Sequence, residues 1–206
     1  MTARITAKAF HSAEGVDDWR VLYHLVSAYF WTSSLGKGIA LVDEIGRLAG
    51  ATELKIDLRP AGVTVSLLRR DVDLARKISA AARALDLPAD PTAVQVLNVS
   101  IDALVIEDVL PFWRALLGYG QLDDDYLYDP QGRGPGISFQ PMDAPRPQRN
   151  RIHLDVAVPH DQAEARIAAA LAAGGRLVTD THAPKWWVLA DPEGNEACIA
   201  TWLGRE

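Results

Sequence analysis

The sequence predicts an α+β protein of two domains, and three observations support this fold class. A break at Asp86–Thr92 contains two prolines and no helical period. Before the break, strand-like and helix-like patterns alternate in the order ββαββα. After it, a strand, a helix and further strands occur twice, with a period of about 55 residues. We therefore expect one domain over residues 1–88 and another over 94–206, each of ordinary domain size.

Composition narrows the class of protein further. The 206 residues are 49% hydrophobic and 23% charged, as in an ordinary globular chain, and the formal net charge of −6 argues against a nucleic-acid partner. The lone cysteine, Cys198, excludes an intrachain disulfide and a cluster of cysteine ligands. There is no apolar run of about 18 residues and no apolar core in the first ten residues. We expect a cytoplasmic protein without a membrane partner.

In the first domain, hydrophobic spacing and capping residues define the elements. Ser33 or Ser34 can begin a helix that Gly50 ends, since apolar residues recur there at helical spacing. A second amphipathic helix has its apolar residues on one face. The expected elements are strands within Trp19–Thr32, a helix from about Ser34 to Gly50, strands Leu54–Leu58 and Val63–Leu67, and a helix over Asp71–Leu85.

In the second domain, the same order of elements occurs twice. The first copy is predicted as a strand at Val94–Ile101, a helix at Glu107–Leu117, and strands at Tyr126–Tyr128 and Gly136–Phe139. The second copy is predicted as a strand at Arg151–Val158, a helix at Gln162–Ala173, and strands at Arg176–Thr179, Trp186–Ala190 and Glu196–Trp202. The repeat rests on the order of elements, because the two halves share little visible identity.

Several motifs of the second domain resemble a known superfamily. They are Asn98–Ile101, Phe112–Tyr119 (FWRALLGY), Arg151–Val156 and Asp191–Cys198 (DPEGNEAC). Together they resemble the glyoxalase/bleomycin-resistance/dioxygenase domain of the vicinal oxygen chelate superfamily, over about residues 94–204. The resemblance implies paired βαβββ modules that form a half-barrel cup. Dicarbonyl adducts, catechols, epoxides and antibiotics are the ligands that this superfamily implies.

The resemblance also implies where a divalent metal would be held. The inward strand positions used by metal-binding members fall on Asn98, on Ser138 or Gln140, on His153, and on Cys198 with Glu196 two residues earlier. Only His153 keeps the usual ligand type, and amide side chains are poor ligands for transition metals. We therefore expect no metal cofactor. If an ion does bind, the expected ligands are His153, Glu196 and Cys198.

The same cup supplies the candidate functional residues. His153 and Glu196 are the candidate catalytic residues, because an imidazole and a carboxylate can exchange protons with a ligand. The candidate ligand-binding residues are Asn98, Tyr126, Tyr128, Gln140, Trp187 and Cys198. Neighbouring strand residues face opposite sides, so one of Trp186 and Trp187 faces the cup and the other faces away. The alternatives are a core or interface role for these tryptophans, a small buried hydrophobic role for Cys198, and a hydrogen-bonded polar role in the cup for His153.

The first domain resembles a pterin-4a-carbinolamine dehydratase domain, over about residues 10–85. The matching residues include Trp19-Arg20, Tyr29-Phe30, Ile56–Arg59 and Asp71–Ala75. That family's activity depends on a His-His-Pro motif, whose positions fall here on Thr52, Glu53 and Leu54. The expectation is a domain of this kind that has lost the dehydratase site.

Four functions remain open at this point. The favoured one is a small-molecule binder or enzyme that uses the C-terminal cup without a metal. The alternatives are a metal-dependent lyase, isomerase or dioxygenase; a 4a-hydroxytetrahydrobiopterin dehydratase; and a non-catalytic assembly protein. Because unpaired sheet edges need partners or protection, and because both resembled families self-associate, we also expect a homodimer.

Overall fold

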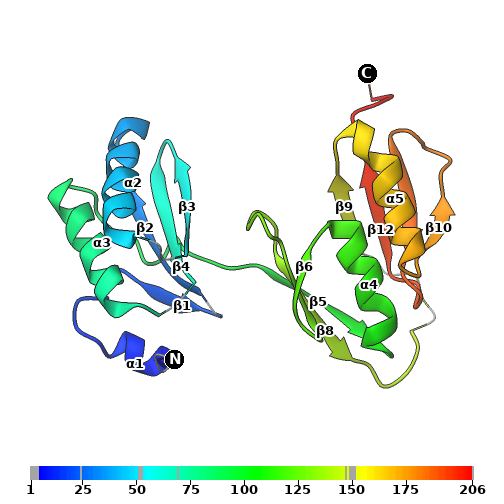
Figure 1. Ribbon diagram of the computed structural model, residues 1–206, viewed down its shortest axis with the longest axis horizontal. Helices are drawn as coiled ribbons and strands as arrows, with labels where there is room; N and C mark the ends of the chain where they lie inside the picture. The colour runs from blue at the N-terminus through cyan, green and yellow to red at the C-terminus, as the bar shows by residue number, and fades with distance from the viewer. Residues whose placement is uncertain are drawn as a thin grey trace. The chain divides into compact units, whose positions relative to one another are not determined.

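The computed structural model describes residues 5–23, 25–50, 53–68, 70–146, 148 and 152–205. The chain forms two compact units, Met1–Val96 and Leu97–Glu206 (Figure 1). The predicted α+β class is confirmed: a ββαββα unit is followed by two βαβββ modules. No helix in the described ranges is long and apolar enough to span a membrane.

The first unit is a four-stranded antiparallel sheet with α2 and α3 on one face (Figure 1). The strand order is β1-β2-β4-β3. The elements are α1 (Ala7–His11), β1 (Arg20–Leu22), β2 (Leu25–Trp31), α2 (Leu35–Ala49), β3 (Leu54–Arg59), β4 (Gly62–Leu67) and α3 (Val72–Ala84).

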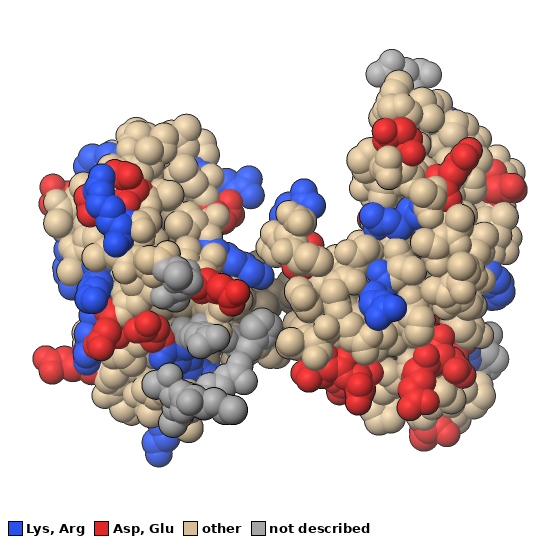
Figure 2. Space-filling model, viewed as in Figure 1, with Lys and Arg blue, Asp and Glu red and all other residues tan. Residues whose placement is uncertain are grey.

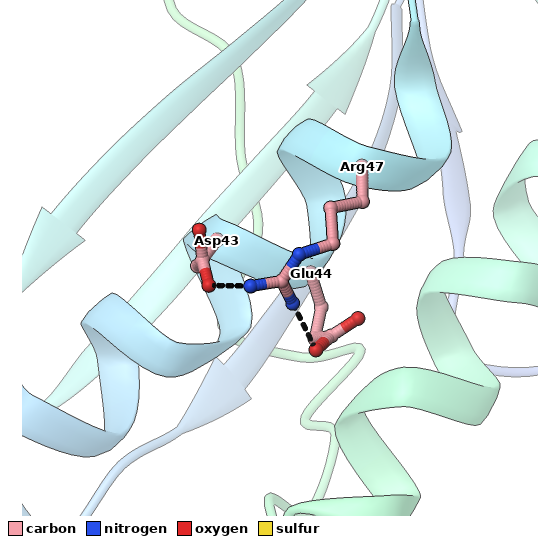
Figure 3. A network of polar contacts seen from close by, with 3 residues as sticks. All are labelled: Asp43, Glu44 and Arg47. Carbon is pink, nitrogen blue, oxygen red and sulfur yellow. Dashed lines mark hydrogen bonds and ion pairs between the residues drawn. The ribbon is translucent and has the colours of Figure 1, made fainter.

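Capping side chains fix where the two long helices begin. The Ser34 hydroxyl accepts a hydrogen bond from the Lys37 N–H at the start of α2, and Asp71 does the same for the Leu74 N–H of α3. On the exposed side of α2, Arg47 pairs with both Asp43 and Glu44 (Figure 3). Such exposed pairs contribute less than about 1 kcal/mol, so burial of the opposite helix face is what holds α2 in place.

The core of the first unit extends into the proline-containing break. Leu87 is buried in this core, and the Trp31 N–H donates to the Pro88 carbonyl at 2.9 Å. The Asp90 N–H donates to the Tyr29 carbonyl at 2.8 Å, and Trp31 Nε1 donates to the Asp90 carboxylate at 3.2 Å. The first residues after α3 therefore line the edge of β2 beyond the end of β1.

The second unit contains two four-stranded mixed sheets, β5-β8-β7-β6 and β10-β11-β12-β9. The first module consists of β5 (Asn98–Ala103), α4 (Ile106–Leu117), β6 (Gly120–Asp123), β7 (Tyr126–Tyr128) and β8 (Gly136–Pro141). The second consists of β9 (Leu154–Ala157), the 3-10 turn His160–Gln162, α5 (Ala163–Ala172), β10 (Arg176–Thr179), β11 (Trp186–Ala190) and β12 (Glu196–Ala200). Strands β5 and β9 are each the edge of their sheet and pair in parallel with β8 and β12.

One hydrophobic core joins the two modules. Helices α4 and α5 contact each other, and their buried residues pack with the apolar faces of both sheets (Figure 1). Along β5, Val99 and Ile101 pack against this core, whereas Asn98, Ser100 and Asp102 occupy the other face. The face opposite the helices is therefore the polar one.

Candidate functional site

The polar face of the first module carries an ordered group of small side chains. Asn98 Nδ2 donates to the Ser138 hydroxyl at 2.9 Å, and the hydroxyls of Ser100 and Ser138 lie 2.8 Å apart. Parallel pairing places Asn98 beside Gly136 and Ser100 beside Ser138, which brings these groups together. The Asn98 amide is thus held by the neighbouring strand.

Two tyrosines lie over glycines on this same sheet. A Cβ atom on Gly136 would lie 1.9 Å from the Tyr126 hydroxyl and 2.8 Å from the Asn98 oxygen, so only glycine leaves room for both. Tyr128 lies in the same way over Gly120 and is 43% exposed. The predicted residues Asn98, Tyr126 and Tyr128 therefore belong to one surface of β5, β7 and β8.

The second module contributes a compact group of metal-binding residue types. The nearest ligand atoms of His153, Asp155 and Cys198 all lie within 4.8 Å of one another. His153 Nε2 is 3.5 Å from an Asp155 oxygen, and parallel pairing sets Cys198 beside Asp155. The side chains of His153 and Asp155 are 44% and 68% exposed, and Cys198 is buried.

An open cavity of about 1010 Å³ lies along β5, the start of β9 and the hairpin before β12. This volume is at the upper end of the range for small-molecule sites. The residues that line it are partly apolar and include Val99, Ile101 and Leu154. Its charged lining residues are Asp102, Arg146, His153, Glu193 and Glu196.

The structure brings some predicted site residues together and separates others. His153 and Glu196, the candidate catalytic pair, both line the cavity. The six candidate ligand-binding residues are not among the described residues that line the cavity. The six are Asn98, Tyr126, Tyr128, Gln140, Trp187 and Cys198. Gln140 is exposed on β8 beside Asp102, and Trp187 packs against the hydrophobic core.

In the first unit, the structure describes two of the three positions of the dehydratase motif, Glu53 and Leu54. Glu53 is exposed immediately before β3, and Leu54 packs against the core of that unit. Thr52 lies outside the described residues, as does Arg151 at the predicted start of the strand before β9.

A buried carboxylate that the sequence did not mark as functional fixes one wall of the cavity. Asp191 is 0% exposed and accepts hydrogen bonds from Trp113 Nε1 at 3.0 Å and from the Glu193 N–H at 3.0 Å. It also accepts bonds from the backbone and side-chain N–H groups of Asn195, at 2.9 and 2.8 Å. Asp191 thus links the DPEGN hairpin to the FWRALLG helix, the two motifs with the most specific spacing.

Glu193 makes a second connection between the hairpin and the first module. Its two carboxylate oxygens accept the N–H groups of Leu104 and Val105, each at 2.8 Å, immediately before α4. Val105 is the residue that caps α4, and its apolar side chain cannot accept a hydrogen bond. The hairpin therefore supplies the acceptor that the local sequence lacks, and it is hydrogen-bonded both to α4 and to the residues just before α4.

The metal positions implied by the superfamily are only partly suitable. On β5 and β8 they hold Asn98 and Ser138, which bond each other. Immediately before β9 and on β12 they hold His153 and Cys198, and Asp155 of β9 completes a group of three. Within the described ranges this is the one such group. A ligand set drawn from both sheets does not fit these residues, whereas the second module alone brings three residues of ligand type within 4.8 Å of one another.

Two βαβββ modules with an open cavity along β5 and the start of β9 define the class of the second unit. The family model of the glyoxalase-like domain matches residues 98–200. The chain belongs to this family. No curated protein matched the chain, and none of the comparisons identifies the first unit as a pterin dehydratase-like domain.

Solved structures show similarity to the second half of the chain. A glyoxalase-related enzyme from Fulvimarina pelagi is 20% identical and has a TM-score of 0.39, covering 52% of this chain and 86% of its own. A glyoxalase/bleomycin resistance protein/dioxygenase family enzyme from Burkholderia phytofirmans PsJN is 18% identical with a TM-score of 0.39, covering 52% and 97%. A fosfomycin resistance protein from Listeria monocytogenes is 8% identical with a TM-score of 0.42, covering 53% and 92%.

Proposed function

We propose that the second unit binds a small organic molecule in the cavity along β5 and β9 and acts on it as an enzyme that uses His153 and Glu196. The observation that carries this proposal is that both residues line one cavity, together with apolar residues such as Val99 and Leu154. Arg146 and Asp102 line it as well and offer opposite charges to a polar ligand.

The two groups suit acid–base chemistry. An imidazole can take up and release a proton near neutral pH, and the Asp155 carboxylate, 3.5 Å from Nε2, lies close enough to orient the ring. Glu196 lies on the neighbouring strand β12 and is half-buried. A ligand proton could then be taken by one group while the other donates one, which is the division of roles in general acid–base catalysis.

A ligand screen tests this proposal. Catechols, epoxides and dicarbonyl–thiol adducts would be screened by thermal shift, and hits would be measured by calorimetry. We expect His153→Gln and Glu196→Gln each to weaken binding about tenfold and to lower any turnover about 100-fold or more. His182→Gln is the matched control, since His182 is exposed and is not among the lining residues. Hits that bind both cavity variants as tightly as the control would refute the site.

A second candidate function rests on the group of His153, Asp155 and Cys198. Imidazole, carboxylate and thiolate together suit Zn²⁺ or a similar ion, and a bound ion would supply a Lewis acid beside the cavity. Metal analysis of protein purified without chelators separates the two candidates. A stoichiometric ion that is lost in both His153→Gln and Cys198→Ser would support the metal-dependent function. Less than about a tenth of an ion per chain, unchanged by added Zn²⁺, Fe²⁺, Ni²⁺ or Mn²⁺, would exclude it.

A further inference from the structure

The cavity of the second unit lies against the free edge of β5. Four consecutive residues of this strand line it, from Val99 to Asp102. Because neighbouring side chains of a strand point to opposite faces, a cavity that all four residues line lies along the edge of the strand. Strand β5 pairs with β8 on one side, and no described strand pairs with its other side. Main-chain groups of β5 therefore border the cavity together with side chains.

The direction of these main-chain groups follows from one hydrogen bond at the end of β5. The Met142 N–H donates to the Ala103 carbonyl at 2.8 Å, so the backbone groups of Ala103 point toward β8. Successive residues of a strand direct their N–H and C=O groups alternately to its two sides. The N–H and C=O groups of Ser100 and Asp102 therefore point away from β8, toward the free edge.

The hairpin before β12 already uses the next group in this series. The Leu104 N–H points to the same side and donates to the Glu193 carboxylate at 2.8 Å. Within the described part of the chain, no hydrogen bond reaches the outward backbone groups of Ser100 and Asp102. Both residues are exposed. Two donors and two acceptors of one strand edge are thus open to a ligand in the cavity.

The charges beside this edge are not evenly distributed. Asp102 and Glu193 place two carboxylates at the C-terminal end of β5. The basic lining residues lie on other segments: His153 comes immediately before β9, and the Arg146 guanidinium is 3.8 Å from the Asp143 carboxylate. A cationic group of a ligand is therefore favoured at the C-terminal end of the β5 edge.

We propose that the cavity binds the N-terminal residues of a peptide in extended conformation, antiparallel to β5. The second and fourth peptide residues pair with Asp102 and Ser100, and each pair exchanges two hydrogen bonds. Antiparallel pairing places the peptide's terminal ammonium group at the C-terminal end of β5, near the Glu193 carboxylate. Addition of a strand to an open sheet edge is a general mode of peptide recognition. The inference rests on the proposed ligand-binding role of this cavity and names the class of ligand.

A proline at position 100 tests the backbone pairing from the protein side. Ser100→Pro removes an outward N–H but none of the hydrogen bonds to β8, and an edge strand tolerates proline at such a position. Ser100→Ala keeps the N–H and removes only the hydroxyl. With the full chain and the amidated pentapeptide Val-Thr-Val-Thr-Val in calorimetry, Ser100→Pro should bind at least about tenfold more weakly than Ser100→Ala. Circular dichroism would verify that both variants are folded.

N-methylated peptides test the same pairing on the wild-type protein. Methylation of the second or fourth peptide nitrogen removes a donor to the β5 edge and should weaken binding at least about tenfold. Methylation of the third nitrogen, which points away from β5, should weaken it less. Equal effects at all three positions would overturn the proposal.

Acetylation of the pentapeptide tests the orientation, because it removes the positive charge of the N-terminus. The acetylated peptide should bind about fivefold more weakly than the free one. Asp102→Asn keeps the backbone groups and should reduce this preference. Asp124→Asn makes the same change in charge in an exposed turn and should retain it. Equal binding of the free and acetylated peptides by the wild-type chain would overturn the proposed orientation and with it the proposal.

Failure of this inference can be distinguished from failure of the proposed function. If the pentapeptide does not bind, while small molecules from the ligand screen bind in a manner that requires His153, the peptide inference is overturned and the proposed function stands. If neither the peptide nor any small molecule binds, both are overturned. Peptide binding that Ser100→Pro and Ser100→Ala affect equally would also overturn the inference, because the bound edge would then not be that of β5.

Discussion

At the scale of single residues, Asp191 shows what a local motif can and cannot reveal. The sequence DPEGN predicts a hairpin, because an aspartate can bind N–H groups two and four residues later, as it does for Glu193 and Asn195. Trp113, which also donates a hydrogen bond to Asp191, is 78 residues away in the sequence. This bond follows only from the packing of α4 against the hairpin. His153 and Glu196 could be selected because they fall on ligand positions that the superfamily implies, whereas Asp155 could not, since it lies in the Arg151–Val156 motif but on none of those positions.

Replacing Asp191 by Asn should destabilise the second unit. Both carboxylate oxygens of Asp191 accept hydrogen bonds from N–H groups. Asn has nearly the same size, but one of these oxygens would be replaced by an NH₂ group, which cannot accept a hydrogen bond and would face the N–H donors. We expect the free energy of unfolding to fall by about 2–4 kcal/mol, measured by urea denaturation. Asp124→Asn, in an exposed turn, is the control and should change stability by less than about 0.5 kcal/mol. Equal effects of the two changes would contradict the role given to Asp191.

At the scale of elements, the long and strongly periodic segments were the predictable ones. Helices α2 and α3 begin at capping residues and α4 ends at Gly118, and all three have apolar faces; these features can be recognised in the sequence. Strand β6, with the sequence GQLD, has no strand pattern and was not predicted; it forms because β7 offers it a partner. The position of the cavity depends on how β5 and β9 come together, which element prediction does not determine.

The stability of the loop between β7 and β8 should depend on pH. Burial raises the pKa of Asp129, but the N–H groups of Gly134, Gln131 and Arg133 outweigh it and lower this pKa below its ordinary value of 3.8. A lowered pKa in the folded state means that Asp129 stabilises the loop above about pH 3.8 and that this contribution is lost as the pH falls through the lowered value. The Gly134 amide signal in NMR should titrate with a midpoint below 3.8. Asp129→Asn should abolish this titration; a wild-type midpoint at or above 3.8 would contradict the prediction.

At the scale of the whole molecule, the order of elements predicted the α+β class, and the prolines indicated a division of the chain. The way the break itself packs was not predictable, because Leu87 and the backbone of residues 88–90 use a core and an edge formed by distant residues. On the face shown in Figure 2, basic and acidic side chains are mixed over the first unit, and acidic side chains gather along the lower part of the second unit.

The two hydrophobic cores share no residue, which leads to a prediction about how the chain unfolds. Ile78 is fully buried in the first core and Ile199 in the second. Removing one methylene with Ile78→Val or Ile199→Val should cost about 1 kcal/mol and lower the melting temperature of its own unit by about 4–8 °C. In differential scanning calorimetry, each variant should shift a different part of the unfolding profile. A single transition that both substitutions shift by the same amount would show instead that the two units unfold as one cooperative body.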